Sequence, residues 1–305
     1  MNNKQKSITL GEGNTPLFRL FNLEKLLNWQ NEIWAKAEYQ NPTGSFKDRG
    51  SVTEITETLK KKKKGIVCAS TGNMAASLSA YAANAKIECC VIVPKNTSPI
   101  KLKQATIYGA QLIEVNSNYD ECVKKAKEFS KKNNFLLCGD YELRRLGQRS
   151  IGRELANSGE NFNAFIAPIG NGTLGCAIIE GFVEKGFWPK FIGVQGKGSD
   201  PIFQAWKNNT SMNQFIEAPQ TIASAMKVGK PLDGQLTLNW ISETKGMMLS
   251  TNDSEIINAQ KLLAKNEGIY VEASAAATLA GLIKAKNRIN ALKIVLILTG
   301  SGLKE

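Results

Sequence analysis

The sequence of 305 residues contains no histidine. Without an imidazole, neither a Ser-His-Asp nor a Cys-His catalytic site can form, and a histidine-ligated metal site is excluded as well. Acid–base chemistry must therefore come from Lys, Asp, Glu or Tyr side chains, or from a cofactor. We accordingly expect no metal cofactor.

Long apolar segments are also missing. The longest apolar run near the end of the chain, Ile294–Leu298, is far shorter than the roughly 20 residues that a membrane-spanning helix needs. The segment Met1–Leu10 is polar and lacks an apolar core of signal-peptide length. We therefore expect a soluble, cytoplasmic protein without a membrane partner.

The six cysteines show no CxxC spacing, and most of them lie inside apolar stretches. Reduced, buried thiols are therefore expected rather than a metal site or disulfides. The net charge of +12 would suit nucleic acid only if it were concentrated on one face. The densest basic cluster, Lys60–Lys64, closes a probable helix, where the helix dipole favours cations. We therefore expect no nucleic-acid partner.

Short β-branched runs alternate with longer helical stretches, which is typical of an α/β fold with parallel strands. In the first half, strands are predicted at 66–69, 88–93, 111–115 and 135–137. Helices are predicted between them, at 74–84, 100–108 and 119–132. The second half repeats this alternation, with strands at 164–167, 191–194 and 294–298. One helix is predicted to follow the segment 170–175 and to end at 184, and another is predicted at 253–265. The stretch 208–247 has little periodicity and is predicted to be irregular.

Two loops have the strand–loop–helix placement that suits anion binding. Gly170–Gly175 is glycine-rich, so backbone N–H groups at a helix start could approach a phosphate. Ser70–Asn73 offers two hydroxyls and an amide, which suit a carboxylate, but a plain helix N-cap explains it equally well. Neither loop is a P-loop or a GxGxxG fingerprint, so nucleotide binding has little support.

A third segment, Asn41–Gly50, contains Lys47 next to Phe46. An aromatic neighbour would partly desolvate the amine and ready it for imine formation. This segment closely resembles the lysine motif of the threonine synthase-like members of the tryptophan-synthase-β-like (fold type II) family of pyridoxal 5′-phosphate (PLP) enzymes. Further matches follow in the same order along the chain: Gly11–Leu17, Ala69–Asn73, Thr221–Ala225, Glu267–Ser274 and Leu298–Lys304.

The resemblance implies a role for each matching residue. Lys47 would carry PLP as a Schiff base and act as the catalytic acid–base group. The remaining cofactor-binding positions would be Asn73 at the 3′-oxygen, Gly170, Asn171, Gly172 and Thr173 at the phosphate, and Thr299 at the pyridine nitrogen. The substrate-binding positions would be Ser70, Thr71, Gly72 and Gln148, with Arg144 as a source of positive charge.

The resemblance also implies the architecture. Two open, twisted α/β domains would hold PLP in the cleft between them. Residues 1–48 and 141–305 would form the large PLP-binding domain, and residues 49–140 the small α/β domain. Family members commonly dimerise, so a homodimer acting on a small amino-acid substrate is expected.

Several positions depart from the threonine synthase pattern. Met74 stands where a threonine usually helps to hold the substrate's phosphate, and Cys138 and Gly139 replace an Asn-Ser pair. Each lost charge-assisted hydrogen bond should cost about 1–3 kcal/mol. Arg144 and Arg145 could supply replacement charge, because arginine binds phosphate with two parallel hydrogen bonds.

Three functions therefore compete. The overall match favours a PLP-dependent lyase of the threonine synthase type, which converts O-phosphohomoserine to threonine and phosphate. The departures favour a PLP-dependent β-elimination or β-replacement enzyme acting on another amino acid, such as an ammonia-lyase, a dehydratase or a cysteine-synthase-like enzyme. A non-catalytic PLP-binding protein is disfavoured by the intact Lys47, Asn73, Gln148 and Thr299.

Overall fold

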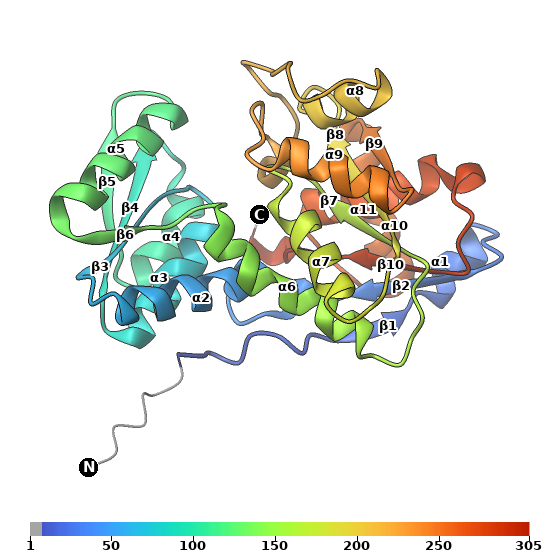
Figure 1. Cartoon of the computed structure of the whole chain (residues 1–305), viewed down its shortest axis with the longest axis horizontal. Coiled ribbons are helices and arrows are strands. Elements are labelled where there is room, and N and C mark those ends of the chain that lie inside the picture. The colour runs from blue at the N-terminus through green and yellow to red at the C-terminus, as the bar shows by residue number, and fades with distance from the viewer. Residues whose placement is uncertain (1–7, 305) are drawn as a thin grey trace, which may run out of the picture. The chain divides into compact units, whose positions relative to one another are not determined.

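The computed structural model describes residues 8–304 and consists of two compact units (Figure 1). The smaller unit contains residues 8–12 and 41–147, and the larger unit contains residues 13–40 and 148–304. Each unit has its own sheet of mainly parallel strands. The α/β fold with parallel strands that the alternation predicts, and the two α/β domains that the family resemblance implies, are thus confirmed.

The smaller unit is built on four parallel strands in the order β5-β4-β3-β6. These strands are β3 (Gly65–Ala69), β4 (Glu88–Pro94), β5 (Gln111–Val115) and β6 (Phe135–Leu137). Its helices are α2 (Lys47–Lys60), α3 (Asn73–Ala85), α4 (Pro99–Ile107) and α5 (Tyr119–Asn133). A further helix, α6 (Glu142–Ala156), begins in this unit and continues into the larger one.

Strand β3 is one of the two inner strands of the smaller sheet, and all of its residues are buried. Both faces of the sheet are therefore covered by apolar groups. One face packs against α2, α3 and α4, which supply Ile55, Leu78 and Leu102. The opposite face packs against α5 through Cys122 and Ala126. Strands that are buried on both sides carry continuous apolar runs, which is why this region is easy to predict from sequence.

The larger unit has six strands in the order β1-β2-β10-β7-β8-β9, and all neighbours are parallel except β1 and β2. They are β1 (Leu17–Arg19), β2 (Glu32–Lys36), β7 (Ala164–Pro168), β8 (Lys190–Gly196), β9 (Met247–Thr251) and β10 (Lys293–Ile297). The helices are α1 (Phe21–Leu26), α7 (Thr173–Val183), α8 (Pro201–Lys207), α9 (Gly234–Glu243), α10 (Asp253–Glu267) and α11 (Ala273–Lys284). Short 3₁₀ turns occupy Glu38–Gln40, Ser224–Met226, Lys286–Arg288 and Gly302–Lys304.

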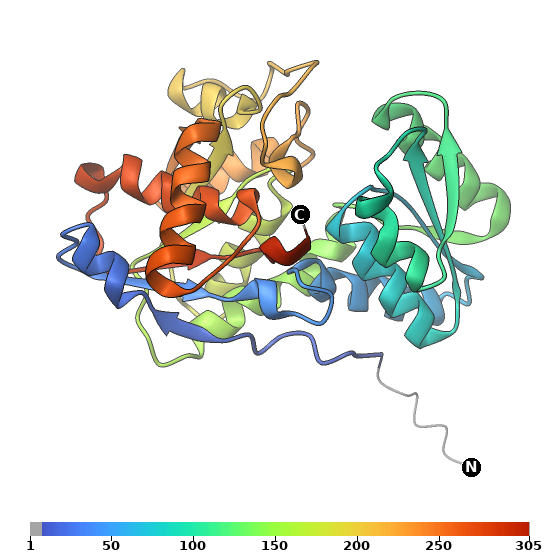
Figure 2. The ribbon, with the colours of Figure 1, turned by 180° about the vertical axis from the view of Figure 1, so that it is seen from behind.

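Helices cover both faces of the larger sheet. The helices α1, α10 and α11 share one core cluster with alternate residues of the strands, and Figure 2 shows the orange α10 and α11 on that side. On the other face, Phe165 of β7 stacks on Phe191 with ring centroids 4.9 Å apart and on Phe182 of α7 at 5.9 Å. Alternate strand residues therefore fill two separate apolar layers.

The division into units lies at residues 40/41 and 147/148, whereas the sequence expectation placed it at 48/49 and 140/141. The loop that precedes α2 and the first turns of α6 thus belong to the smaller unit. Residues 8–12 belong to it as well, and the Tyr81 hydroxyl donates a hydrogen bond to Glu12 Oε2 at 2.6 Å. These segments belong to the smaller unit, although the residues next to them in the sequence on one side belong to the larger unit.

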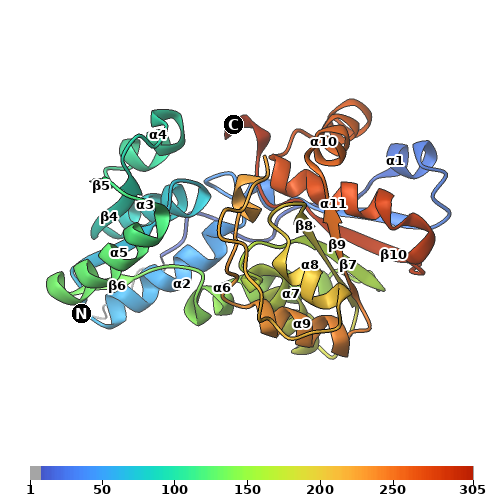
Figure 3. The same ribbon diagram turned by 90° about the horizontal axis from the view of Figure 1, so that it is seen from above.

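The prediction of an irregular stretch at 208–247 is wrong in part, because α9 lies within it. This helix buries only Gly234, Thr237 and Ile241, so its sequence shows no broad apolar face. It is held by packing on α7 and α8, and Figure 3 shows α8 and α9 side by side. By contrast, the predicted start of α10 is confirmed, since Asn252 and Glu255 form a capping box.

Within residues 8–304, no helix has the length and apolarity required to cross a membrane. The expectation for Met1–Leu10 falls mostly on residues outside that range. All six cysteines are free and buried, as predicted. Burial raises the pKa of the Cys89 thiol to about 11, so that thiol is uncharged at neutral pH.

The stacked phenylalanines generate the first testable prediction. Phe165→Ala should destabilise the protein by about 3–5 kcal/mol, because a fully buried ring is replaced by a cavity. Leu292→Ala is the control: its side chain is 68% exposed and the change should stay within about 0.5 kcal/mol. Thermal and urea unfolding of both variants measure the difference, and equal stabilities would contradict the proposed role of this layer.

Candidate active site

Lys47 is the first residue of α2, directly after the loop that begins at Asn41. Asp48 fixes this loop, because its carboxylate accepts hydrogen bonds from the Thr43 backbone N–H at 2.8 Å and from the Thr43 hydroxyl at 2.5 Å. The Lys47 side chain is only 15% exposed, and its Nζ lies 4.9 Å from the centre of the Phe46 ring. The shielding expected from the sequence is therefore present.

The Lys47 ammonium also has a partner that the motif did not predict. Its Nζ donates a hydrogen bond to Asp140 Oδ1 at 2.9 Å, and the Asp140 side chain is 18% exposed. Asp140 follows β6 and precedes α6. The sequence offered one general signal for it, since functional side chains gather at the carboxyl ends of parallel strands.

The loop Ser70–Gly72 connects β3 to α3, and the backbone N–H of Gly72 donates to Ser70 Oγ at 3.3 Å. Ser70 and Thr71 are half-buried, and Gly72 is exposed, so that a Cβ added there would meet no atom within 4 Å. Asn73 is the first residue of α3. The loop thus presents polar groups at a helix start, a placement that suits an anion, and its binding role stays a prediction.

Helices α2 and α3 run in the same direction, since α2 leads into β3 and α3 leads out of it. They touch through Ser51 and Ser77, whose hydroxyls are 2.7 Å apart. Lys47 and Asn73 each lie four residues, about one helical turn, before these serines. The packing therefore brings the two predicted cofactor residues of the smaller unit to the same end of the helix pair.

In the larger unit, Gly170–Thr173 follows β7 and opens α7. Gly172 has φ +95°, which other residues rarely adopt, and a Cβ there would lie 2.3 Å from Thr237 Oγ1. A Cβ on Gly170 would lie 2.7 Å from the Ala225 carbonyl oxygen. The turn is also fixed from outside, because the Asp233 N–H donates to the Asn171 carbonyl at 2.9 Å. Glycine is therefore required at both positions by the close backbone approach.

Several buried polar side chains of the larger unit have no hydrogen-bond partner among the described residues, and three of them stand at predicted site positions. They are the hydroxyls of Thr173 and Thr299 and both amide atoms of Gln148. Thr173 and Thr299 follow β7 and β10, which are neighbours in the sheet and parallel, so both hydroxyls lie at its carboxyl edge. A buried polar group without a partner costs about 1–3 kcal/mol. Such groups are expected where a ligand supplies the missing bonds.

The Arg144 side chain is fully buried, and its guanidinium is already bonded to other residues of the protein. Its guanidinium forms an ion pair with Glu54, which is 2% exposed, and donates to the Gly139 carbonyl at 3.2 Å and to the Lys47 carbonyl at 3.1 Å. Burial raises the pKa of the Glu54 carboxyl, which the guanidinium and the Gly139 N–H counteract. The positive charge that the sequence suggested for a substrate phosphate is thus already compensated by a carboxylate.

The positions that depart from the family pattern lie in or beside the apolar core of the smaller unit. Met74 and Cys138 are 8% and 2% exposed and belong to the same cluster. The Gly139 N–H donates to Glu54 Oε1 at 3.0 Å. Neither Met74 nor Gly139 offers a side-chain donor, so this part of the smaller unit is poorer in phosphate-binding groups than the family pattern.

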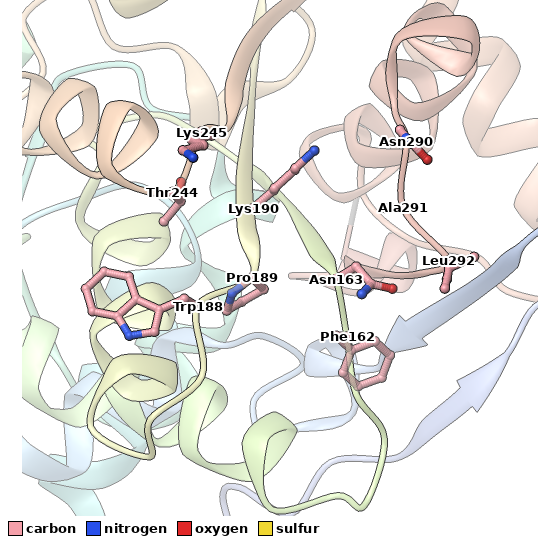
Figure 4. Close-up of a pocket in the computed structure, with 10 residues that line it drawn as sticks. All are labelled: Phe162, Asn163, Trp188, Pro189, Lys190, Thr244, Lys245, Asn290, Ala291 and Leu292. Carbon is pink, nitrogen blue, oxygen red and sulfur yellow. The ribbon is translucent and has the colours of Figure 1, made fainter.

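The larger unit also has a cavity of about 450 Å³ on the opposite edge of its sheet (Figure 4). It lies at the amino-terminal ends of β7, β8 and β10, where Asn163, Lys190 and Leu292 line it. None of the predicted site residues belongs to it. Ligands of parallel sheets bind at the carboxyl ends of the strands, so this cavity is not the candidate site.

Comparison with known proteins identifies the family. Residues 8–300 match the model of the pyridoxal-phosphate dependent enzymes. The chain belongs to this family. It is 37% identical to a threonine synthase of Methanocaldococcus jannaschii over 99% of its length and 78% of that protein. A threonine synthase of Halalkalibacterium halodurans is 36% identical over 98% of the chain and 84% of that protein. The chain is therefore a PLP-dependent lyase related to threonine synthases, as its sequence predicts.

Solved structures agree on the fold. A processed threonine deaminase isoform from Solanum lycopersicum superimposes with a TM-score of 0.83, at 23% identity, over 94% of this chain and 79% of that one. Maize serine racemase gives a TM-score of 0.85, at 21% identity, over 94% and 88%. Both likenesses support the fold type II architecture.

The residues present fit PLP, which the family implies. The Gly170–Thr173 turn places helix N–H groups beside the unpartnered Thr173 hydroxyl, a combination that suits the cofactor's phosphate. The unpartnered Thr299 hydroxyl offers a hydrogen bond that a ring nitrogen could use. Lys47 supplies a shielded amine for a carbonyl group. The individual roles of these residues stay predictions.

The buried ion pair generates the second prediction. Glu54→Gln should destabilise the protein by about 3 kcal/mol and lower its melting temperature by roughly 5–10 °C, because Arg144 stays buried without its carboxylate. Glu57→Gln is the matched control on the same helix, since Glu57 pairs at the surface with Lys61 and should matter by less than about 1 kcal/mol. Equal melting temperatures, measured by circular dichroism, would contradict a structural role for the pair.

Proposed function

We propose that this PLP enzyme is a threonine synthase, which converts O-phosphohomoserine to threonine and releases phosphate. The observation that carries this proposal is the similarity of nearly the whole chain to threonine synthases, at 37% identity over 99% of its length. The resemblance is not limited to the cofactor lysine, because matching segments run from Gly11 to Lys304.

In this proposal Lys47 binds the cofactor and moves the proton at the reacting carbon. Asn73 binds the cofactor's ring oxygen, and the turn Gly170–Thr173, which includes Asn171 and Gly172, binds its phosphate. The placement of Asn73 one helical turn before the Ser51–Ser77 contact supports its role beside Lys47.

Substrate orientation falls to groups at helix starts and to one buried amide. Ser70, Thr71 and Gly72 would bind the substrate carboxylate, aided by Gln148. The two unpartnered amide atoms of Gln148 support this role, because they are fully buried and available to a ligand. When the substrate carboxylate is held, the bond that breaks has a defined position relative to the Lys47 amine.

PLP supplies an electron-withdrawing ring that stabilises negative charge on the substrate carbon next to the amino group. Thr299 would donate to, or accept from, the ring nitrogen but cannot hold it protonated as a carboxylate would. The ring is then a weaker electron sink, which suits reactions in which a leaving group removes the electrons. Release of phosphate is such a reaction.

A second candidate function is supported by the ion pair of Arg144 with Glu54. Because its guanidinium is paired with Glu54, and because Met74 and Cys138 are packed in an apolar core, the groups that would bind a second phosphate are few. A PLP-dependent elimination or replacement on an amino acid with a smaller or neutral leaving group fits this environment. We further propose, from the family resemblance alone, that the enzyme is a cytoplasmic homodimer.

Lys47→Ala should abolish turnover and the absorbance of lysine-bound cofactor, because the amine that would bond to the cofactor is removed. The measurements are the visible spectrum after addition of PLP and the rate of product formation. Lys61→Ala, at an exposed position at the opposite end of the same helix, should change neither. Turnover retained by Lys47→Ala would overturn the assignment of Lys47.

Purified, PLP-loaded protein incubated with O-phosphohomoserine should release inorganic phosphate and threonine in equal amounts, measured together. L-Serine and L-threonine, tested in parallel for ammonia release, represent the second candidate function. Ammonia without phosphate would overturn the threonine synthase proposal in favour of an ammonia-lyase.

A further inference from the structure

Lys47 is held at two atoms by one short stretch of the smaller unit. Its side-chain Nζ donates to Asp140 Oδ1 at 2.9 Å, and its backbone carbonyl accepts from Arg144 Nη1 at 3.1 Å. Asp140 and Arg144 lie on either side of the start of α6. Both ends of the lysine are therefore tied to the same segment.

That segment is itself fixed by the buried ion pair. Glu54 Oε1 accepts from the Gly139 N–H at 3.0 Å, and Arg144 Nε donates to the Gly139 carbonyl at 3.2 Å. The pair thus binds both backbone groups of the residue that precedes Asp140. Because Arg144 and Glu54 are 0% and 2% exposed, little solvent competes for these bonds.

The close approach of α6 to α2 depends on two glycines, Gly50 and Gly147, which have no side chain. A Cβ on Gly50 would lie 2.5 Å from Arg144 Cγ. A Cβ on Gly147 would lie 2.2 Å from the Arg49 carbonyl. Because neither position has a Cβ, Arg144 can pack against α2, where its guanidinium contacts Glu54 and the Lys47 carbonyl.

We propose that Asp140 is a positioning residue for Lys47, and that the Glu54–Arg144 pair holds Asp140 in place for this task. Whenever the lysine is not bonded to the cofactor, the Asp140 carboxylate holds its ammonium in the orientation from which it acts. Arg144 is accordingly part of this support and not a ligand of the substrate. The inference rests on the proposed cofactor lysine but not on the proposed substrate.

Asp140 should have opposite effects on two measurable steps. Lys47 Nζ must give up its hydrogen bond to Asp140 before the nitrogen can attack PLP, so Asp140→Asn should let the cofactor-free protein capture PLP faster, on the order of fivefold. The same change should lower kcat by at least about tenfold with little change in KM, because the returning lysine is no longer oriented. A protein that is merely misfolded would lose both rates together.

The experiment compares wild type, Asp140→Asn and Glu142→Gln. The last variant makes the same charge change two residues away at an exposed position and should leave both rates unaltered. PLP capture is followed by absorbance after mixing with cofactor-free protein, and it needs no substrate. Capture by Asp140→Asn that is slower than, or within twofold of, the wild-type rate would overturn the proposal.

Arg144→Lys provides a second arm. It keeps the positive charge but loses the planar set of donors that reaches Glu54, Gly139 and Lys47. We expect PLP capture to change in the same direction as in Asp140→Asn and kcat to fall, with KM for the accepted substrate unchanged. A tenfold rise in KM for O-phosphohomoserine at constant kcat would instead make Arg144 a substrate ligand and overturn the supporting role. If O-phosphohomoserine is not a substrate, the capture rates still decide the proposal.

Discussion

The constraint on which this structure depends is that a parallel strand must be followed by a segment that returns the chain to the start of the next strand. Each return here begins with a loop at the carboxyl end of a strand, usually followed by the amino end of a helix. Loops of this kind expose backbone N–H groups that are not used by the helix. Ser70–Gly72 and Gly170–Thr173 occupy two such places, after β3 and β7. Both sheets therefore offer anion-binding positions before any side chain is specified.

A buried charge pair adds a second layer of order in the smaller unit. Neither Glu54 nor Arg144 can be removed alone without leaving a charge in an apolar core. Their hydrogen bonds to Gly139 and Lys47 convert this pair into a fixed connection between α2 and the start of α6. The lysine of the proposed active site is consequently attached to a pair of charges that is almost fully buried.

The larger unit uses the opposite device. Thr173, Thr299 and Gln148 are buried and lack partners among the described residues, so their polar atoms are desolvated in advance. A ligand that bonds to them gains interactions without first displacing competing side chains. Stability is thus given up at the positions that we propose bind the cofactor and substrate, while the neighbouring phenylalanine layer is fully packed.

The sequence alone determined the α/β fold, because strands buried on both faces need continuous apolar runs, as in Ile66–Ala69 and Ile294–Leu298. It also determined the cofactor, through the ordered motifs around Lys47. Only the tertiary structure decided the partners of Arg144, since Glu54 lies 90 residues away in the chain and nothing local signals their contact. The helix α9 was likewise missed, because packing on α7 and α8 stabilises it rather than its own periodicity. Side-chain pairs that are distant in sequence depend on how helices pack, and local patterns do not encode that packing.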